Sequence, residues 1–464
     1  MNHREVDKEE LFERMPVGKA LFTMAVPTII SQLINLIYNL ADTFFIGRTG
    51  NSYMMAGVTV PFPLFMMTIA FSNLFGIGGG SEMARLIGQH RGERARKVSA
   101  FAFFGCLILA ACYSVINLIF TDPLLTLLGA SDQTIGFARQ YVRWVVVAGS
   151  IPTIASMVAA HLLRNIGYSR QAGFGLSAGG ILNIILDPLF MFVLLPDGME
   201  VYGAALATML SNVCTAIYFL VIIFRLQKTA PISLRISDAR DILPGERKAL
   251  FSVGIPSAFL TGLFDVANAF LNAIMSGHGD LMLAAIGIVM KVVRLPNAIN
   301  IGICQGMLPI VAYNFSSGDH DRMNETIRTS RKAGLLICLI CMVFYELTAN
   351  FLSGLFLSTG TSGAGEAAKT ISYAALFLRI QCLASPFQFM NYSTSFCMQA
   401  IGDGRDTMIH VVIRQIILYI PLMFLLDRLF GAYGLVSSVI FSEAVASAAA
   451  LFLLNRYLKA HRAV

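Results

Sequence analysis

Long apolar segments restrict the fold of this sequence more than any other feature. Each is close to or above the roughly 20 apolar residues that a helix needs to cross a bilayer, and all are far longer than the ~10-residue strands of a transmembrane barrel. The twelve segments span residues 20–46, 54–84, 98–121, 138–163, 172–195, 202–225, 249–275, 282–313, 331–357, 370–398, 407–427 and 434–456. Only 13% of the residues are charged, against about 25% in soluble domains. The sequence therefore predicts an all-α polytopic membrane protein with twelve transmembrane helices.

Lys and Arg residues fall mainly on one side of the predicted bundle. If both termini share a side, the connections on that side carry 25 of the 34 basic residues, and those on the opposite side carry five. Because cytoplasmic loops carry the excess of Lys and Arg, we expect both termini in the cytoplasm and the chain in a bacterial-type plasma (inner) membrane. The net charge of +7 would then face the anionic headgroups of the bilayer, and no nucleic-acid partner is expected.

The two halves of the chain resemble each other. Residues 21–30 read "LFTMAVPTII" and residues 250–259 read "LFSVGIPSAF", one of four matches at offsets of 226 to 235 residues. Each half begins on the same side, so we expect two pseudo-symmetric six-helix bundles related as parallel repeats. Such repeats are typical of transporters with binding sites near the membrane midplane. The predicted parts are a cytoplasmic N-terminal segment (1–19), an N-lobe (20–225), a cytoplasmic inter-lobe loop (226–248), a C-lobe (249–456) and a cytoplasmic tail (457–464).

Polar side chains share one face of the first predicted helix. At 100° per residue, Gln32, Asn35, Asn39 and Asp42 fall within a stripe about 80° wide, and Tyr38 lies in the same motif. Amide side chains on such a stripe can simply form hydrogen bonds between helices. A carboxylate at membrane depth is costly and usually functional, so the stripe favours an ion or substrate pathway.

The fifth and sixth helices add a second carboxylate and further oxygen atoms. Asn183 and Asp187 are four residues apart and share a helix face, and Thr208 follows on the next helix. With Asp42, these oxygen ligands suit Na⁺, or H⁺ because two nearby carboxylates cannot both ionise easily. No imidazole-rich or thiolate cluster is present, so transition metals are poor candidates. The prediction is a cation-coupling site without an organic cofactor.

The C-lobe carries charges at membrane depth as well. Asp265 on the seventh helix could pair with Lys291 or Arg294 on the eighth, either as a structural salt bridge or as a second titrating or substrate-binding site, and the sequence leaves both open. Arg379 and Arg414 are expected near helix ends, where a long side chain can place its charge at the membrane interface.

Several motifs resemble the multidrug and toxic compound extrusion (MATE) family over essentially the whole chain. They are "IYNLADTFF" on the first helix, "LNIILDPLF" on the fifth, "YGAALATMLS" on the sixth and "GIGGGSEMARLIGQHRGE" after the second. The likeness is greatest to the prokaryotic branch with an N-lobe cation site. It implies a V-shaped pair of lobes that exports cationic or amphipathic compounds in exchange for H⁺ or Na⁺. The positions that match the family's cation site are Asp42, Asn183, Asp187 and Thr208, with Tyr38 and Asn39 in the same motif.

The tenth helix departs from the family pattern. Some members carry acidic residues on the seventh and tenth helices; Asp265 lies near the first position, but residues 370–398 contain no acid. This weakens the case for a C-lobe Na⁺ site.

Other function classes fit less well. A lipid-linked oligosaccharide flippase of related architecture would carry more cationic charge in its cavity; Lys291 and Arg294 favour it, whereas the carboxylate motifs oppose it. Catalytic motifs such as HExxH are missing, and "GIGGGSEMAR" lacks the Lys of a phosphate loop, so we expect no enzyme activity and an ion gradient as energy source. The expected partners are small amphipathic or cationic substrates and the lipid bilayer, with the protein as a monomer.

Overall fold

The computed structural model describes residues 10–355 and 364–462, and every regular element in those ranges is a helix. The first half contains η1 (Glu10–Arg14), α1 (Val17–Gly47), α2 (Ser52–Thr59), α3 (Phe62–Gly88), α4 (Gly92–Ile119), α5 (Thr121–Leu127), α6 (Ile135–Tyr141), η2 (Val142–Ala148), α7 (Ser150–Asn165), α8 (Ser169–Leu189), η3 (Phe190–Leu194) and α9 (Glu200–Leu226). The second half contains α10 (Ile236–Arg240), α11 (Pro244–Ser276), α12 (Asp280–Ser317), α13 (His320–Leu355), α14 (Ala364–Cys382), α15 (Ser385–Ile401), α16 (Gly404–Val412), η4 (Ile413–Tyr419) and α17 (Ile420–Arg462).

The twelve predicted spans map onto these helices, although not one to one. Nine stretches in the described residues are long and apolar enough to cross a membrane, and a tenth results when α6–η2 and α7 count as one span bent by 48°. The predicted span 370–398 is divided between α14 and α15. The last two predicted spans lie in one continuous stretch, Gly404–Lys459.

That last stretch is a hairpin. Gly431 interrupts the helix with φ 60° and ψ −149°, a conformation that glycine adopts easily because it lacks Cβ. Arg414 and Glu443, on either side of Gly431, form an ion pair at 2.7 Å, and Arg456 pairs with Asp406 at 2.8 Å. Asp406 and Arg456 each lie 25 residues from the glycine, and the other pair also joins residues before and after it, so the two arms are antiparallel. Counting α14–α15 as one span and this stretch as two gives the predicted twelve.

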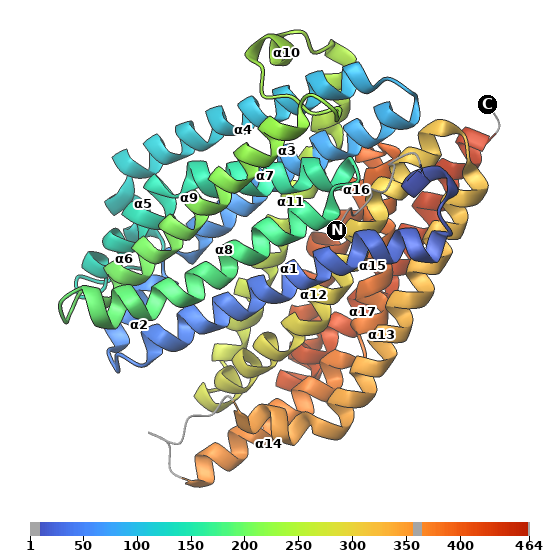
Figure 1. The fold of residues 1–464 in the computed structure, drawn as a ribbon. Helices are drawn as coiled ribbons and strands as arrows, with labels where there is room; N and C mark the ends of the chain where they lie inside the picture. Colours follow the sequence, from blue (N-terminus) through green and yellow to red (C-terminus); the bar gives the residue numbers. More distant parts are fainter. Residues whose placement is uncertain (1–9, 356–363, 463–464) are drawn as a thin grey trace.

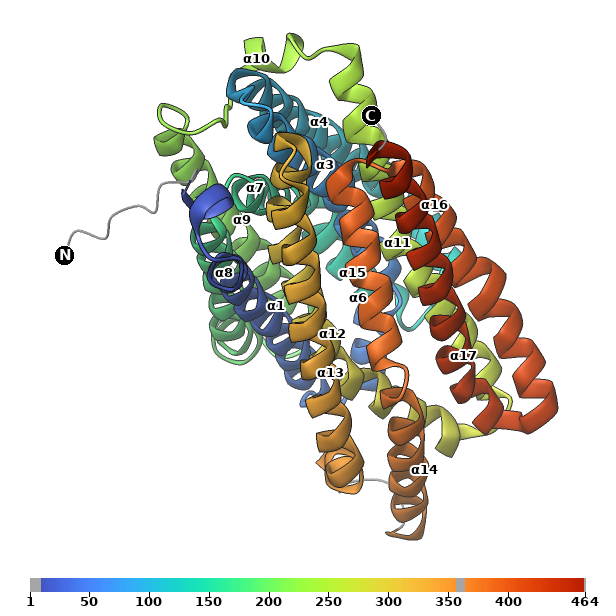
Figure 2. The same cartoon turned by 90° about the vertical axis from the view of Figure 1, so that its right-hand side faces the viewer.

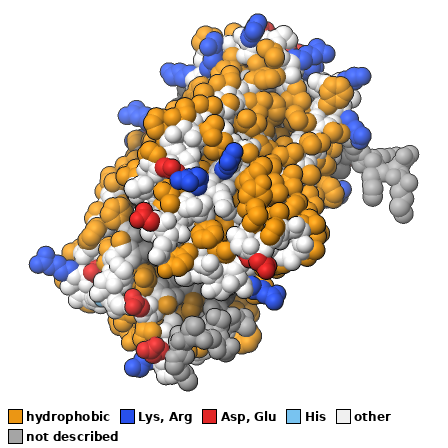
Figure 3. Space-filling model, turned by 90° about the vertical axis from the view of Figure 1, so that its left-hand side faces the viewer, with side chains coloured by type: hydrophobic (Ala, Val, Ile, Leu, Met, Phe, Trp, Pro, Cys, Tyr) orange, Lys and Arg blue, Asp and Glu red, His pale blue; other side chains and the backbone are white. Residues whose placement is uncertain are grey.

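The two halves lie side by side along a shared seam (Figure 1). α3 packs against α11, and α1 packs against α12, so helices near the beginning of each half form the contact. Figure 2 shows the second half turned toward the viewer, with α12 and α13 beside α1. Apolar side chains cover much of the face drawn in Figure 3, as expected for a surface in contact with lipid.

Glycines bring α3 and α11 into backbone contact. A Cβ on Gly254 would lie 2.1 Å from the carbonyl oxygen of Leu74, and one on Gly78 would lie 2.4 Å from the carbonyl oxygen of Leu250. Both distances are shorter than any real contact, so only glycine allows this approach. The contact lies toward the ends of α3 and α11 that face α10, which we call the loop end (Figure 1).

Hydrogen bonds and one aromatic contact join the two halves at the loop end. Arg322 on α13 donates hydrogen bonds to the carbonyl oxygens of Phe12 and Met15, each at 2.6 Å. The Phe12 ring stacks on Tyr313, with 5.1 Å between ring centroids. Arg85 on α3 donates to the carbonyl oxygen of Ala400 at 3.1 Å. Both the first turns of the chain and α3 are thereby bound to the second half.

The segment between the halves packs on the first half. Glu246, in the first turn of α11, forms a 2.5 Å ion pair with Arg94 on α4, and Asp241 pairs with Lys97. α11 begins at Pro244, inside the loop predicted for 226–248, and α1 begins at Val17. These helices extend beyond the apolar runs because their first turns are polar.

Candidate functional site

Three of the predicted cation-site residues form one buried cluster in the first half. Asn183 on α8 donates from Nδ2 to Asp187 Oδ1 at 3.2 Å and to Thr208 Oγ1 on α9 at 3.3 Å. Asp187 is fully buried, and Asn183 and Thr208 are nearly so. The spacing of four residues along α8 brings the amide above the carboxylate, and the packing of α8 on α9 adds the hydroxyl.

Asp42 on α1 joins this cluster from the neighbouring helix. α1 packs against α8, and the Asp42 carboxylate is close enough to interact electrostatically with Asp187. Three buried oxygen atoms here have no hydrogen-bond partner among the described residues: Asp42 Oδ1, Asn183 Oδ1 and Asp187 Oδ2. Buried oxygens without partners are costly, and two carboxylates and an amide are suitable ligands for a proton or a hard cation. The residues present therefore fit the predicted kind of site.

A tyrosine that the sequence does not single out also lies within electrostatic range of the carboxylates. Tyr141, at the end of α6, is buried and interacts electrostatically with Asp42, Tyr38 and Asp187. It lies in "RQYVRW", where no spacing or motif distinguishes it. Only the packing of α6 against α9 could have revealed it.

The remaining residues of the α1 stripe face the space between the halves. Asn39 Nδ2 donates to Asn35 Oδ1 at 3.3 Å, and Gln32 Nε2 donates to Gln305 Oε1 on α12 at 3.4 Å. Gln32 thus connects the two halves directly. α1 therefore presents Asp42 to the buried cluster and its amides to the centre of the molecule.

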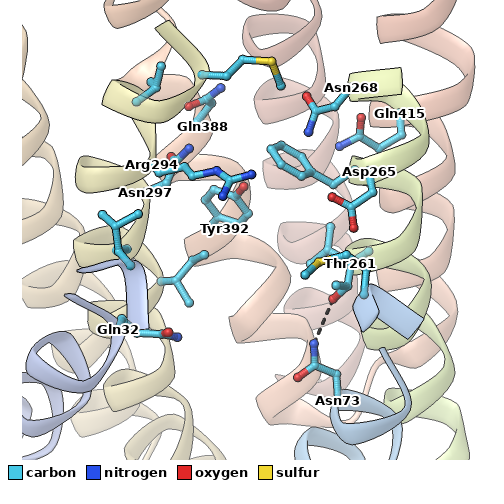
Figure 4. Close-up of a pocket in the computed structure, with 18 of the residues that line it drawn as sticks. Gln32, Asn73, Thr261, Asp265, Asn268, Arg294, Asn297, Gln388, Tyr392 and Gln415 are labelled. Carbon is cyan, nitrogen blue, oxygen red and sulfur yellow. Dashed lines mark hydrogen bonds between the residues drawn. The ribbon is translucent and has the colours of Figure 1, made fainter. Parts of the chain in front are cut away.

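Two cavities adjoin at this place. The central cavity, about 390 Å³, lies between the halves and is lined from α1, α3, α11, α12, α15 and α17 (Figure 4). A second cavity of about 300 Å³ is lined mainly from the first half, by residues that include Tyr38, Asn183 and Thr208, and also from α11 and α12. Gln32 and Asn35 line both cavities. The cavity beside Asn183 and Thr208 and the central cavity therefore share walls.

The charged C-lobe residues divide into two groups. Asp265 on α11 and Arg294 on α12 both reach into the central cavity (Figure 4). Lys291 lines neither cavity. Among the described residues, Asp265 has no ion pair within 4.0 Å with either cation, so the salt-bridge alternative is not what the structure shows. The described residues that line the cavity also do not show the excess of cations expected of the flippase alternative.

The prediction that Arg414 reaches the membrane interface is wrong. Its side chain is 1% exposed and donates to Glu443 from Nε at 3.0 Å and from Nη2 at 2.7 Å. The guanidinium also lies over the Tyr392 ring, 4.7 Å from its centroid. The partner is 29 residues away on the other arm of the hairpin, so single-helix reasoning could not find it. Arg379, in contrast, is well exposed and lies 3.4 Å from Glu346.

Two helical halves around a central cavity that amide and charged side chains help to line, with buried carboxylates in one half, define a membrane transporter of the internal-repeat class. A model of the MatE family matches residues 27–189 and 256–425. The chain is also 30% identical over 445 residues to multidrug export protein MepA of Staphylococcus saprophyticus, an alignment that covers 95% of this chain and 94% of the relative. The chain therefore belongs to the MatE family of transporters and is a multi-pass protein of a bacterial membrane.

Solved structures of MATE proteins share the whole fold. A MATE structure in complex with MaL6 has a TM-score of 0.91 at 23% identity and covers 99% of this chain and 100% of its own. A multidrug resistance MATE family transporter in an outward-facing conformation has a TM-score of 0.90 at 24% identity, with 100% of both chains covered. These matches confirm the predicted twelve-helix fold.

Proposed function

We propose that this protein is a secondary active multidrug efflux antiporter that exports cationic or amphipathic compounds in exchange for H⁺ or Na⁺. The observation that carries the exchange is the group of unpartnered buried oxygens on Asp42, Asn183 and Asp187. The relative MepA is a multidrug export protein. The absence of excess positive charge in the central cavity favours this function over oligosaccharide flipping.

The coupling follows from the position of α1. A proton or Na⁺ at the cluster of Asp42, Asn183, Asp187 and Thr208 would neutralise negative charge and lower the cost of burying both carboxylates together. α1 carries Asp42 at this cluster and Gln32 at the seam with α12. A change in ion occupancy therefore biases how α1 packs, and with it the relative stability of the two arrangements of the halves.

The proposal also includes which end of the protein faces the cytoplasm. The distribution of Lys and Arg predicts that the loop end faces the cytoplasm. In the structure the halves touch closely at that end through Gly78 and Gly254. Substrate would leave from the opposite end in this arrangement and would enter from the cytoplasm when the loop end opens.

Transport by purified protein in liposomes tests the coupling. Asp42→Asn and Asp187→Asn are each expected to reduce ethidium transport, driven separately by a Na⁺ or a pH gradient, to the level of protein-free liposomes. Asp122→Asn is the matched control, because Asp122 is exposed and pairs only with Arg139 on the surface. Normal gradient-driven transport by either of the first two variants would remove that carboxylate from the mechanism.

A further inference from the structure

The central cavity holds one unpaired charge of each sign. Its lining contains three charged residues, Asp265, Arg294 and Glu443. Glu443 is already neutralised by Arg414. Asp265 and Arg294 approach the same space from α11 and α12 (Figure 4), interact electrostatically, and yet form no ion pair within the 4.0 Å that defines the pairs observed elsewhere in the described chain.

The rest of the polar lining consists of neutral amides. Eleven of the lining residues are Asn or Gln. Several are buried with unused hydrogen-bonding atoms: both Oε1 and Nε2 of Gln399, Oε1 of Gln415 and Oδ1 of Asn297 have no partner. Gln399 is fully buried, and Gln415 is 2% exposed. Unsatisfied buried amides normally cost stability, so these atoms point to a polar occupant of the cavity.

The charge balance restricts that occupant. With Glu443 paired, the lining is neutral overall, one carboxylate against one guanidinium. A monocation bound at Asp265 would leave the Arg294 guanidinium without an anionic partner in the same cavity. A molecule with a cationic and an anionic group can satisfy both residues, and the planar fork of Arg294 suits a carboxylate. The rings of Phe264 and Phe396 in the same lining can contact its apolar body.

We propose that the central cavity selects zwitterionic amphipathic solutes, which place a cationic group at Asp265 and a carboxylate at Arg294 and use the amides for neutral polar groups. This inference rests on the proposed efflux function and narrows its substrate class. It also explains why Asp265 and Arg294 face each other across open space: a direct ion pair would close the site.

Two dyes that differ by one ester test the proposal. Rhodamine 110 carries a delocalised cation and a carboxylate, and rhodamine 123 is its methyl ester and carries the cation alone. Binding is measured by fluorescence polarisation with the full-length protein in nanodiscs, without any ion gradient. The wild type is expected to bind rhodamine 110 on the order of 10- to 100-fold more tightly than rhodamine 123, the range of a hydrogen-bonded charge contact.

Variants then test which residue binds the cationic group of the dye and which binds its carboxylate. Arg294→Gln should remove the preference by weakening rhodamine 110 alone, whereas Asp265→Asn should weaken both dyes. Arg294→Lys keeps the charge but not the fork and should retain part of the preference. Lys291→Gln is the matched control: it removes a cation one helical turn away on α12 that lines neither cavity, and it should leave both affinities unchanged.

The outcomes separate this inference from the proposed function. Equal or tighter binding of rhodamine 123 by the wild type overturns the inference whatever the variants do, including any that fail to fold. An unchanged preference in Arg294→Gln overturns the assignment of the carboxylate end. Dye binding is measured without a gradient, so it is independent of transport. If the wild type shows no dye preference but still transports ethidium along a gradient, only this inference is refuted. If the wild type keeps the dye preference but does not transport ethidium, only the proposed antiport is refuted.

Discussion

Replacing Glu443 by Gln should leave Arg414 as an uncompensated charge inside the second half. The two side chains are only 7% and 1% exposed, and Glu443 accepts from Arg414 at 2.7 Å and from Asn391 at 2.6 Å. His410 extends the network, with Nε2 at 3.0 Å from Asn391 Oδ1. Gln has the shape of Glu but not its charge, so the change isolates the electrostatic contribution.

The expected loss is large for one substitution. Removing one partner of a buried pair costs about 3–5 kcal/mol, because the remaining charge cannot regain its hydration. This corresponds to roughly 10²- to 4 × 10³-fold in the unfolding equilibrium constant. Replacing both residues by apolar ones, Arg414→Met with Glu443→Leu, should cost less than Glu443→Gln alone, since no charge is then buried.

Reversible unfolding in mixed detergent micelles, followed by circular dichroism, measures these free energies. The reasoning fails if Glu443→Gln unfolds with the free energy of the wild type, or if the double variant is less stable than the single one. The first result would mean that water reaches Arg414, and the second that the pair contributes net stability beyond avoiding an unpaired charge.

Arg322→Ala removes three hydrogen bonds to backbone carbonyls around η1 and should lower the local stability of Glu10–Arg14 by about 1.5–3 kcal/mol; unchanged amide hydrogen exchange in that segment would contradict this. Gly254→Ala places a Cβ 2.1 Å from a backbone oxygen of α3, so exchange along α3 should rise. Gly262→Ala, with no atom within 4 Å, should not change that exchange, and equal effects of the two would show that the close contact is unimportant. Tyr141→Phe removes a hydroxyl within electrostatic range of Asp42 and Asp187 and should slow gradient-driven ethidium transport several-fold while dye affinity is kept; a loss of dye affinity alone would place Tyr141 in substrate binding.

Apolar segments were sufficient to predict the helices, because each span must satisfy its backbone hydrogen bonds within itself in lipid. The break between α14 and α15 and the exact helix starts were not predictable, since packing and polar first turns determine them. Within the site, Asn183 and Asp187 were found because they share one helix face. Tyr141 and the partner of Arg414 were not, because those contacts join helices that are distant in sequence.

The contacts of η1 with the second half restrict how far the beginning of α1 can move away from that half. Only Met15 and Pro16 separate this anchored turn from α1, while α1 itself packs along α8 in the opposite half. η1 therefore connects α1 to α13 through a short link. The halves can separate at this end only if the hydrogen bonds from Arg322 to this segment break. A proteolytic cut within η1, or a lipid that competes for Arg322, is expected to ease the separation of the halves at this end while the residues that line the cavity stay the same.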